Sequence, residues 1–403
     1  MSILIMLRFI RQERALMKKP IRVICLIANA APYGSNSALL NLLEMLISKG
    51  VKPLVVMSSS GGICEILKER NIPHLQVKYY YSIYPRLKSL KDFILFVPIL
   101  CRTILYNFIA IKKLTQIGRK YKADLIHTNI GPLHIGYHVA KRLHIPHIWH
   151  IREYQELYLG WRPLFSRKGF TKKLSSKNSH PISITNGLYK HYSMKENARV
   201  IYDGVLKTSQ TQFISQKEKY FLFVGRLEKA KGIIELIDAF IEFAKQNNDY
   251  KLLVLGDGTE KFKSYLRVAI HNAKMIDNIL FLGFRNDVPN LMAHATALVV
   301  SSSFEGFGFT TVEAMFNGCL VIGKNAGGTK EILEENKLGI LYNENHELIT
   351  IFHELAKSGV EKYLPTITKA QEISGKLFSC ENNSDKVLKF YRTVISNNVT
   401  FSG

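Results

Sequence analysis

The sequence predicts an α/β protein that carries two doubly wound parallel sheets, each in a domain of its own. Short apolar runs alternate with helical segments along the chain, a pattern typical of parallel sheets covered by helices. The alternation restarts after a polar junction at 206–219, and 403 residues exceed the size of one ordinary domain. We expect an extension at 1–19, a first domain at 20–205, a second domain at 206–382 and a final helical segment at 383–403.

The first domain opens on a strand expected at 21–28, a continuously apolar run of the kind buried inside a parallel sheet. A loop and a helix that ends at Gly50 follow it. Further segments of this domain are expected as strands at 53–58, 124–127, 145–149 and 182–185 and as a helix at 64–69.

The second domain repeats the alternation. Its segments are expected as strands at 220–224, 252–255, 279–282, 297–300 and 320–322, with a helix at 233–246. Ligands bind beyond the carboxyl ends of parallel strands, so we expect the functional residues on the loops that follow the strands. Two such sheets facing each other would leave a cleft between the domains.

Net charge separates the two halves of the chain. Residues 1–200 contain 32 Lys and Arg against 9 Asp and Glu, whereas residues 201–403 contain 23 of each kind. A basic first domain indicates contact with nucleic acid or anionic lipid, although a solvated basic surface gives the same charge. The sequence contains no helix-turn-helix, zinc-finger or RNA-binding aromatic motif, so we expect no nucleic acid partner.

An apolar segment at 93–101 lies among basic residues, with Lys91 before it and Lys112 after it. Two interpretations stay open: a helix anchored in the plane of a membrane, or a helix buried in the first domain. No stretch reaches the eighteen or so consecutive apolar residues that span a bilayer. The extension at 1–19 lacks the order of a signal peptide, and translation starting at Met17 is the alternative to a native extension. Five scattered cysteines indicate reduced thiols and a cytoplasmic location.

The densest functional motif is SSSFEGFGFTTVE at 301–313. Glu305 lies on the expected loop, and Glu313 lies one turn into a helix expected to start near Phe309. The free N–H groups and positive dipole end of that helix favour a phosphate, and the Glu313 carboxylate can accept both hydroxyls of a ribose. Two glycines of the motif let the backbone approach a ligand closely, Gly306 and Gly308.

Two further motifs of the second domain combine a strand, a turn and a helix. FVGRLEKAKG places Arg226 and Lys231 after a strand, where two cations can neutralise a diphosphate leaving group without a metal. NAGGTKEIL places Gly327 and Gly328 where their N–H groups can reach a sugar or a phosphate.

These motifs together resemble those of the family-4 retaining glycosyltransferases, which have the GT-B architecture of two Rossmann-like domains. The resemblance rests on FVGRLEKAKG, LGDG, FLGF, SSFEGFGFTTVEAMFNG and AGGTKEIL, in that order within 220–335. The first domain matches more loosely, through its opening strand and glycine loop, IHTN around His127 and WHIRE around His150. In the GT-B architecture a C-terminal helix crosses back to the first domain, and we expect the same of 383–403.

The resemblance implies a role for each motif of the second domain. Arg226 and Lys231 would hold the donor diphosphate, Glu313 would bind the ribose, and Glu305 would contact the donor sugar at the reacting face. The remaining donor contacts that it implies are Gly283 and Phe284, beside the nucleotide base, and Gly306, Phe307, Gly308, Phe309, Gly327 and Gly328.

In the first domain the resemblance implies that Gly34 lies close to the donor phosphate and the acceptor. The loop around Gly34 reads YGSN, where many relatives have two glycines and an acid. His150 resembles the family's active-site histidine, which contacts the transferred sugar. His127 also follows a strand, and the sequence leaves its role open between structure and function. The tyrosine cluster at 79–84 predicts an acceptor groove or a membrane interface.

Metal binding is not expected. His144, His147 and His150 are three positions apart, and residues three apart on a strand face opposite sides, so His147 and His150 cannot easily share one ion. His134 and His138 are one helical turn apart, but no nearby ligand completes a site.

The predicted function is metal-independent transfer of a hexose, with retention, from a nucleotide sugar to a lipid-linked glycan acceptor. UDP is favoured over GDP, and the nucleotide sugar is a co-substrate, so no cofactor is expected. We expect surface polysaccharide or glycolipid assembly, peripheral to the cytoplasmic face of a membrane that the basic first domain contacts. The alternatives are a non-catalytic nucleotide-sugar-binding partner in a glycan-assembly complex and a different GT-B enzyme, such as a sugar-nucleotide epimerase. The sequence does not predict the oligomeric state.

Overall fold

The structure is a computed structural model that describes residues 19–31, 34–85, 87, 89–157, 160–164 and 166–400. The extension predicted at 1–19 therefore lies, apart from Lys19, outside the described residues, and so does Tyr33 of the glycine loop. The chain divides into two compact units, one formed by the chain up to Gly204 together with the part from Cys380 on, and the other by Val205–Ser379. The predicted domain boundaries lie one and three residues further along the chain.

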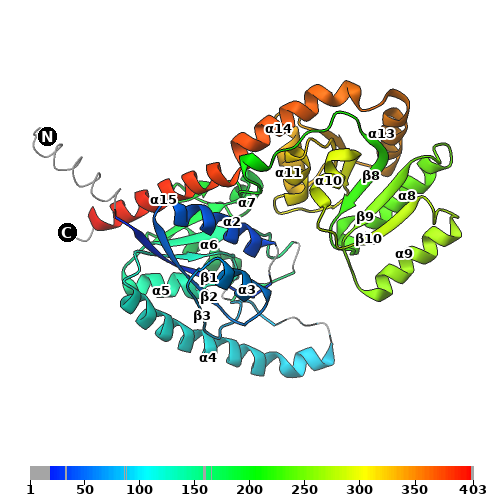
Figure 1. Cartoon of the computed structure of the whole chain (residues 1–403). Helices are drawn as coiled ribbons and strands as arrows, with labels where there is room; N and C mark the ends of the chain where they lie inside the picture. Colours follow the sequence, from blue (N-terminus) through cyan, green and yellow to red (C-terminus); the bar gives the residue numbers. More distant parts are fainter. Residues whose placement is uncertain are drawn as a thin grey trace, which may run out of the picture. The chain divides into compact units, whose positions relative to one another are not determined.

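The first unit contains a seven-stranded sheet in the order β3-β2-β1-β4-β5-β6-β7, whose strand pairs are parallel. Figure 1 labels β1, β2 and β3 of this sheet. Its strands are β1 Ile21–Ile27, β2 Val51–Met57, β3 His74–Gln76, β4 Leu125–Thr128, β5 His147–Ile151, β6 Ser179–Ser183 and β7 Arg199–Val200. Its helices are α2 Ser35–Ser48, α3 Gly62–Glu69, α4 Leu90–Tyr121, α5 Ile135–Leu143, α6 Ser166–Leu174, α7 Asn186–His191 and α15 Cys380–Thr400.

The second unit contains a six-stranded parallel sheet in the order β10-β9-β8-β11-β12-β13. Its strands are β8 Glu218–Val224, β9 Lys251–Leu255, β10 Ile279–Gly283, β11 Ala295–Val300, β12 Val321–Lys324 and β13 Ile340–Tyr342. Its helices are α8 Ile233–Ala244, α9 Glu260–Asn272, α10 Val288–His294, α11 Phe309–Phe316, α12 Gly327–Glu334, α13 Asn345–Ser358 and α14 Leu364–Phe378. The predicted pair of doubly wound parallel sheets is confirmed, and the short strands β3, β7 and β13 are additions to it.

Both faces of the first sheet are buried, which explains the unbroken apolar run of β1. Val23, Cys25 and Ile27 belong to a core that includes residues of α2 and α15. Ile24 and Leu26 belong to a second core with residues of α4 and α5. Successive side chains of a strand point to opposite faces, so a strand covered on both sides must be apolar throughout.

The last helix, α15, belongs to the first unit. Its buried side chains Val387, Tyr391 and Val394 share a core with α2. At the end of α2, Lys49 Nζ lies 2.6 Å from Asp385 Oδ1 of α15. The helix begins at Cys380, three residues before the predicted segment.

Helix α4 is longer and more exposed than the sequence predicts. It runs for 32 residues and continues through Pro98. None of the side chains at 93–101 is buried, so the alternative of a helix buried in the first domain is wrong for this segment. Eight apolar side chains of α4 are between 48% and 78% exposed, namely Leu90, Phe93, Ile94, Val97, Ile104, Leu105, Phe108 and Ile109.

By length and composition alone, α4 could cross a membrane, and among the described residues it is the one helix of that kind. A count of consecutive apolar residues does not identify α4 as a possible membrane-spanning helix, because Arg102 interrupts the apolar run. The exposed apolar positions recur at helical spacing along one side, as in a helix that lies in a membrane surface.

Candidate active site

The site of the second unit lies where the order of its strands reverses. Strand β8 pairs with β9 on one side and with β11 on the other. The loops that leave β8 and β11 therefore emerge side by side at the carboxyl edge of the sheet, which is where open α/β sheets bind ligands. The first loop carries Arg226 and Lys231, and the second carries Glu305.

Lys231 and Glu305 form an ion pair across these two loops. Lys231 Nζ lies 2.7 Å from Glu305 Oε1, and the two side chains are 19% and 18% exposed. Ser301 Oγ also donates a hydrogen bond of 2.9 Å to the carbonyl oxygen of Lys231. Gly232 follows with a φ of 66°, and a Cβ at this position would lie 2.1 Å from the carbonyl oxygen of Ser301. The loop that positions Lys231 thus requires glycine at 232.

Arg226 lies two residues after the end of β8 and is mainly exposed. Its Nη2 lies 3.0 Å from Glu228 Oε1, and its side chain is 64% exposed. An exposed ion pair of this kind contributes about 0–1 kcal/mol, so the guanidinium can leave Glu228 for an anionic ligand at little cost.

The start of α11 provides a helix N-terminus beside Glu305. Gly308 precedes the helix with a φ of 110°, and no side chain caps the first N–H groups. The helix begins at Phe309, as predicted, which places Glu313 one turn into it. Burial raises the pKa of the Glu313 carboxyl. An uncapped N-terminus favours an anion, so phosphate and ribose contacts at this end of α11 remain our expectation.

Three of the predicted donor contacts serve the protein's own packing. Phe307 is 2% exposed and packs against Phe309 and Phe378, with ring centroids 5.2 and 5.8 Å away. The N–H of Gly328 donates to the carbonyl oxygen of Glu305 at 2.8 Å, and Cβ atoms at Gly327 and Gly328 would meet the backbone of Glu305 and Phe307. The expectation that the Gly328 N–H reaches a ligand is therefore wrong, because these glycines let α12 approach the Glu305 loop.

Gly283 and Phe284 lie at the end of β10. Gly283 has a φ of 65°, and a Cβ there would meet no atom within 4 Å. Phe284 is 84% exposed. An exposed aromatic ring beside open space suits stacking on a nucleotide base, as the resemblance implies.

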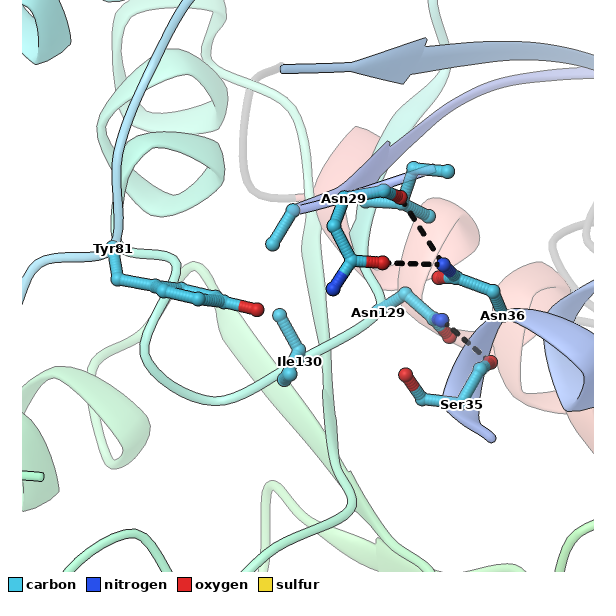
Figure 2. A pocket seen from close by; sticks show the side chains of 8 residues that line it. Asn29, Ser35, Asn36, Tyr81, Asn129 and Ile130 are labelled. Atoms are coloured by element: carbon cyan, nitrogen blue, oxygen red, sulfur yellow. Dashed lines mark hydrogen bonds between the residues drawn. The ribbon is translucent and has the colours of Figure 1, made fainter. Parts of the chain in front are cut away.

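The first unit has a small pocket at the equivalent place in its own sheet (Figure 2). Strand β1 lies between β2 and β4, so the order of strands reverses between β1 and β4. The residues that line the pocket end or follow these two strands or begin α2, except for one tyrosine: Ile27, Ala28, Asn29, Ser35, Asn36, Tyr81, Asn129 and Ile130. Gly34 immediately precedes α2, has a φ of 63° and faces open space where a Cβ would be.

His150 does not occupy the place that its predicted role requires. Strand β5 ends at Ile151, two residues beyond the predicted end, so His150 lies inside the strand. Its side chain is 0% exposed. Its Nδ1 lies 3.3 Å from His127 Nε2, and its Nε2 lies 3.6 Å from Asp203 Oδ1. A direct contact between His150 and the transferred sugar is not compatible with this burial.

Arg152 is the first residue after the carboxyl end of β5. It is 7% exposed and forms an ion pair with Asp203. Its Nε donates to Asn129 Oδ1 at 3.2 Å, and Asn129 Nδ2 donates to the carbonyl oxygen of Ser35 at 2.8 Å. Arg152 and Asp203 therefore hold two residues of the pocket wall.

The sequence reasoning missed Arg152, Asn129 and Asp203. Asn129 and Arg152 stand beside the histidines in the motifs IHTN and WHIRE, and this neighbourhood is the signal that points to them. His127 is also buried, and its Nδ1 contacts the Tyr391 hydroxyl of α15. Burial lowers the pKa of His127 to about 3, so this ring is neutral at pH 7.

Within the described part of the chain, no group of three or more His, Cys, Asp or Glu is placed to hold a metal ion. His144, His147 and His150 are not brought together as ligands. Positive charge at the site of the second unit comes from Arg226, Lys231 and the start of α11.

Comparisons with known proteins agree with this arrangement. Residues 206–372 match the family described as "Glycosyl transferases group 1". The chain is 27% identical to an alpha-monoglucosyldiacylglycerol synthase of Acholeplasma laidlawii over 349 residues, which are 78% of this chain and 83% of that protein. The synthase of the same name from Streptococcus pneumoniae is 26% identical over 320 residues, 71% of this chain and 70% of that protein.

Solved structures show the same fold. The Anabaena protein HepE in complex with UDP aligns with a TM-score of 0.74 and 20% identity, covering 92% of this chain and 99% of that one. A glycosyltransferase from Rickettsia africae aligns with a TM-score of 0.73 and 19% identity, covering 94% of this chain and 100% of that one. The chain therefore has the GT-B fold, and its residues 206–372 match the glycosyl transferases group 1 family.

Proposed function

We propose that this glycosyltransferase moves a hexose from a UDP-sugar, with retention at the anomeric carbon, to a lipid or lipid-linked acceptor. The observation that carries the proposal is the Lys231–Glu305 pair at the strand-order reversal of the second unit, between Arg226 and the uncapped start of α11. Relatives support the choice of substrates: HepE structures contain UDP and UDP-glucose, and two relatives are named as monoglucosyldiacylglycerol synthases.

The chemistry follows from where charge develops. The bond between the anomeric carbon and the diphosphate oxygen breaks, and negative charge accumulates on the leaving nucleoside diphosphate. Lys231, Arg226 and the N–H groups that begin α11 would stabilise that charge more strongly in the transition state than in the ground state. The acceptor oxygen attacks the same face, and its proton passes to the departing phosphate oxygen. The Glu305 carboxylate would face the sugar carbon as positive charge develops there.

Two features support a membrane location for the acceptor. The first 200 residues carry a large excess of basic side chains. Helix α4 exposes an apolar side about twenty residues long, and its exposed cations Lys91, Arg102 and Lys112 stand among these apolar residues. Asn107 of α4 donates to the carbonyl oxygen of Tyr80 at 3.1 Å, which ties the middle of the helix to the unit. A helix held in this way suits an in-plane position at an anionic surface better than a crossing.

The experiment is a screen of UDP- and GDP-sugars for binding and slow hydrolysis in the presence of a metal chelator. We expect one UDP-hexose to bind and turn over, and Arg226→Ala to weaken its binding about tenfold or more. Lys219→Ala is the matched control, because Lys219 forms an exposed pair with Asp249 at the opposite end of the same strand. With an acceptor present, the anomeric proton coupling of the product reports retention or inversion.

Other outcomes identify the alternatives. Binding without turnover in any lipid extract would indicate a non-catalytic nucleotide-sugar-binding partner. Conversion of the free nucleotide sugar into its epimer would indicate an epimerase. Absence of any nucleotide or nucleotide-sugar binding at millimolar concentration would contradict the donor site itself.

A further inference from the structure

Two histidines and a tyrosine form a continuous buried row near the carboxyl ends of β4 and β5. His127 of β4, His150 of β5 and Tyr391 of α15 are each 0% exposed. His127 lies in the middle, since its Nδ1 contacts the Tyr391 hydroxyl and its Nε2 lies 3.3 Å from His150 Nδ1. Buried polar groups are paired as donor and acceptor, so the contacts of this row determine where its protons lie.

Arg152 fixes the first of these proton positions. Its Nη2 lies 3.2 Å from His150 Nδ1, and a guanidinium can only donate hydrogen bonds. Burial lowers the pKa of His150, and the Arg152 charge lowers it further, so the His150 ring is neutral. His150 Nδ1 must therefore be the acceptor, and the single ring proton is on Nε2. That nitrogen faces Asp203 Oδ1 at 3.6 Å.

The remaining protons follow from the first. Two unprotonated nitrogens that faced each other at 3.3 Å would repel, so His127 Nε2 carries a proton and donates it to His150 Nδ1. Burial lowers the pKa of His127 to about 3, so this ring is neutral and its Nδ1 carries no proton. The Tyr391 hydroxyl is then the donor in its contact with His127 Nδ1. Both hydrogen bonds of the row point from α15 toward His150.

The row ends at a side chain whose three terminal nitrogens are all engaged. Besides the contact of Nη2 with His150, Arg152 Nη1 pairs with Asp203, and Nε donates to Asn129 Oδ1 at 3.2 Å. Asn129 in turn donates to the carbonyl oxygen of Ser35, the first residue of α2, at 2.8 Å. A planar guanidinium held at three nitrogens has one orientation, so the loss of one partner loosens it.

The row also involves both places where the chain passes between the two units. Asp203 lies just before Gly204, after which the chain enters the second unit. Tyr391 lies on α15, which begins at Cys380, where the chain returns to the first unit. These two segments are thus joined through buried side chains to Arg152, the residue that follows β5.

We propose that His150 is a positioning residue: as the Nε2–H tautomer, aligned by His127 and Tyr391, it holds the Arg152 guanidinium and does not contact the transferred sugar. The part of this inference that concerns turnover rests on the proposed function, whereas the proton positions do not. The resemblance to known glycosyltransferases implies the opposite role for His150. The two roles are distinguishable, because positioning of Arg152 requires an acceptor at Nδ1.

The first test is the tautomer of each ring in the wild-type chain. Long-range ¹H–¹⁵N correlation spectra of protein labelled with ¹⁵N at histidine distinguish protonated from unprotonated ring nitrogens. At neutral pH we expect an unprotonated Nδ1 and a protonated Nε2 in both His127 and His150. A proton on His150 Nδ1, alone or together with one on Nε2, would overturn the proposal.

Tyr391→Phe tests the direction of the row. It removes the donor to His127 Nδ1, so the ¹⁵N resonance of this nitrogen should move toward that of a nitrogen without a hydrogen bond. Tyr220→Phe is the matched control, because the Tyr220 hydroxyl is also buried but donates to the carbonyl oxygen of Leu291 in the second unit, at 2.7 Å. A His127 resonance that responds equally to both variants would contradict the row.

Two substitutions of His150 separate positioning from sugar contact by turnover. Asparagine places its amide near the position of Nδ1, whereas glutamine places it near Nε2. We expect His150→Asn to keep kcat within about tenfold of wild type and His150→Gln to lose about 100-fold or more, with the KM for the nucleotide sugar little changed in both. The reverse order would indicate a contact through Nε2 and overturn the proposal. Absence of turnover in the wild type would contradict the proposed function alone, because the spectra still decide the tautomers.

Discussion

Lys231 Nζ and Glu305 Oε1 lie 2.7 Å apart, although 74 positions separate them in the sequence. The pair exists because β8 and β11 are neighbours in the sheet and both loops leave its carboxyl edge. A carboxylate and an ammonium held in contact, each about one-fifth exposed, are placed before any ligand binds. Such preorganisation lowers the free-energy cost of stabilising the charge that develops in the transition state.

Gly232→Ala should destabilise the second unit and displace Lys231. The substitution adds a methyl group 2.1 Å from the carbonyl oxygen of Ser301 in a left-handed conformation. We expect a loss of unfolding free energy above the roughly 1–2 kcal/mol that left-handed strain alone costs, with reduced turnover. Gly50→Ala is the control, because Gly50 has a φ of 85° but open space around a Cβ. Thermal unfolding of both variants measures the difference, and equal losses would contradict the close contact.

Acidification should destabilise the first unit through its buried histidines. Burial lowers the pKa of His127 to about 3, and it also lowers the pKa values of His147 and His150. Between about pH 6.5 and pH 3 the unfolded chain binds a proton that native His127 does not. The contribution of neutral His127 to the free energy of unfolding is therefore fully present above pH 6.5. It is lost as the pH falls toward 3, by up to about 1.4 kcal/mol per pH unit for one such histidine.

Denaturant unfolding between pH 8 and pH 5 measures this dependence. We expect His127→Gln to flatten the curve below pH 6.5, whereas His346→Gln, at an exposed position of α13, should keep the wild-type slope. Identical slopes for all three proteins would show that His127 titrates normally in the folded state.

Glu153 should give the opposite dependence. Burial raises the pKa of its carboxyl from 4.5 to about 8, so the native protein keeps a proton that the unfolded chain releases between these values. This contribution to stability is present below pH 4.5 and is lost as the pH rises toward 8. We expect Glu153→Gln to raise the melting temperature at pH 8 relative to wild type and to change it little at pH 5. A gain of the same size at both pH values would contradict the raised pKa.

The apolar side of α4 should determine binding to anionic vesicles. Phe93→Asp combined with Val97→Asp removes two side chains that are 71% and 62% exposed, so the fold should be unaffected. Each buried side chain of this size contributes about 1.5–3 kcal/mol on leaving water, and we expect at least a tenfold loss of affinity for phosphatidylglycerol vesicles. Val268→Asp, at a 56% exposed position of α9, is the control. Vesicle sedimentation at low and high salt separates the apolar contribution to binding from the electrostatic one. Unchanged vesicle binding by the double variant would exclude α4 as the membrane contact.

The fold and the cationic loops could be predicted because they depend on local pattern. An apolar β8 followed by Gly225 and Arg226 specifies a strand and its loop without knowledge of the rest of the chain. The position of His150 could not be predicted, since a two-residue error in the end of β5 moves the exit from the strand from His150 to Arg152. A two-residue shift keeps His150 on the same face of the strand but moves it from the expected loop into the buried sheet.

Tertiary contacts explain the other differences between the sequence-based predictions and the structure. Gly328 looked like a ligand contact because glycine permits close approach, but the group that approaches is the backbone of Glu305 and Phe307. The pairing of Arg152 with Asp203 joins β5 to the residue before Gly204, and no local pattern encodes it. The exposure of α4 likewise depends on which side of the helix the unit covers.

We infer that Lys231 and Glu305 act together at the donor site. The most direct measurement is sugar-nucleotide turnover by Lys231→Met, Glu305→Gln and the double variant, with Lys219→Met and Asp249→Asn as a matched exposed pair. We predict that each single substitution at the site lowers turnover about 100-fold or more. The double variant should turn over only slightly more slowly than the less active single variant, and the substitutions at the exposed pair should leave turnover unchanged. Folded Lys231→Met and Glu305→Gln proteins with turnover within threefold of wild type would contradict the account.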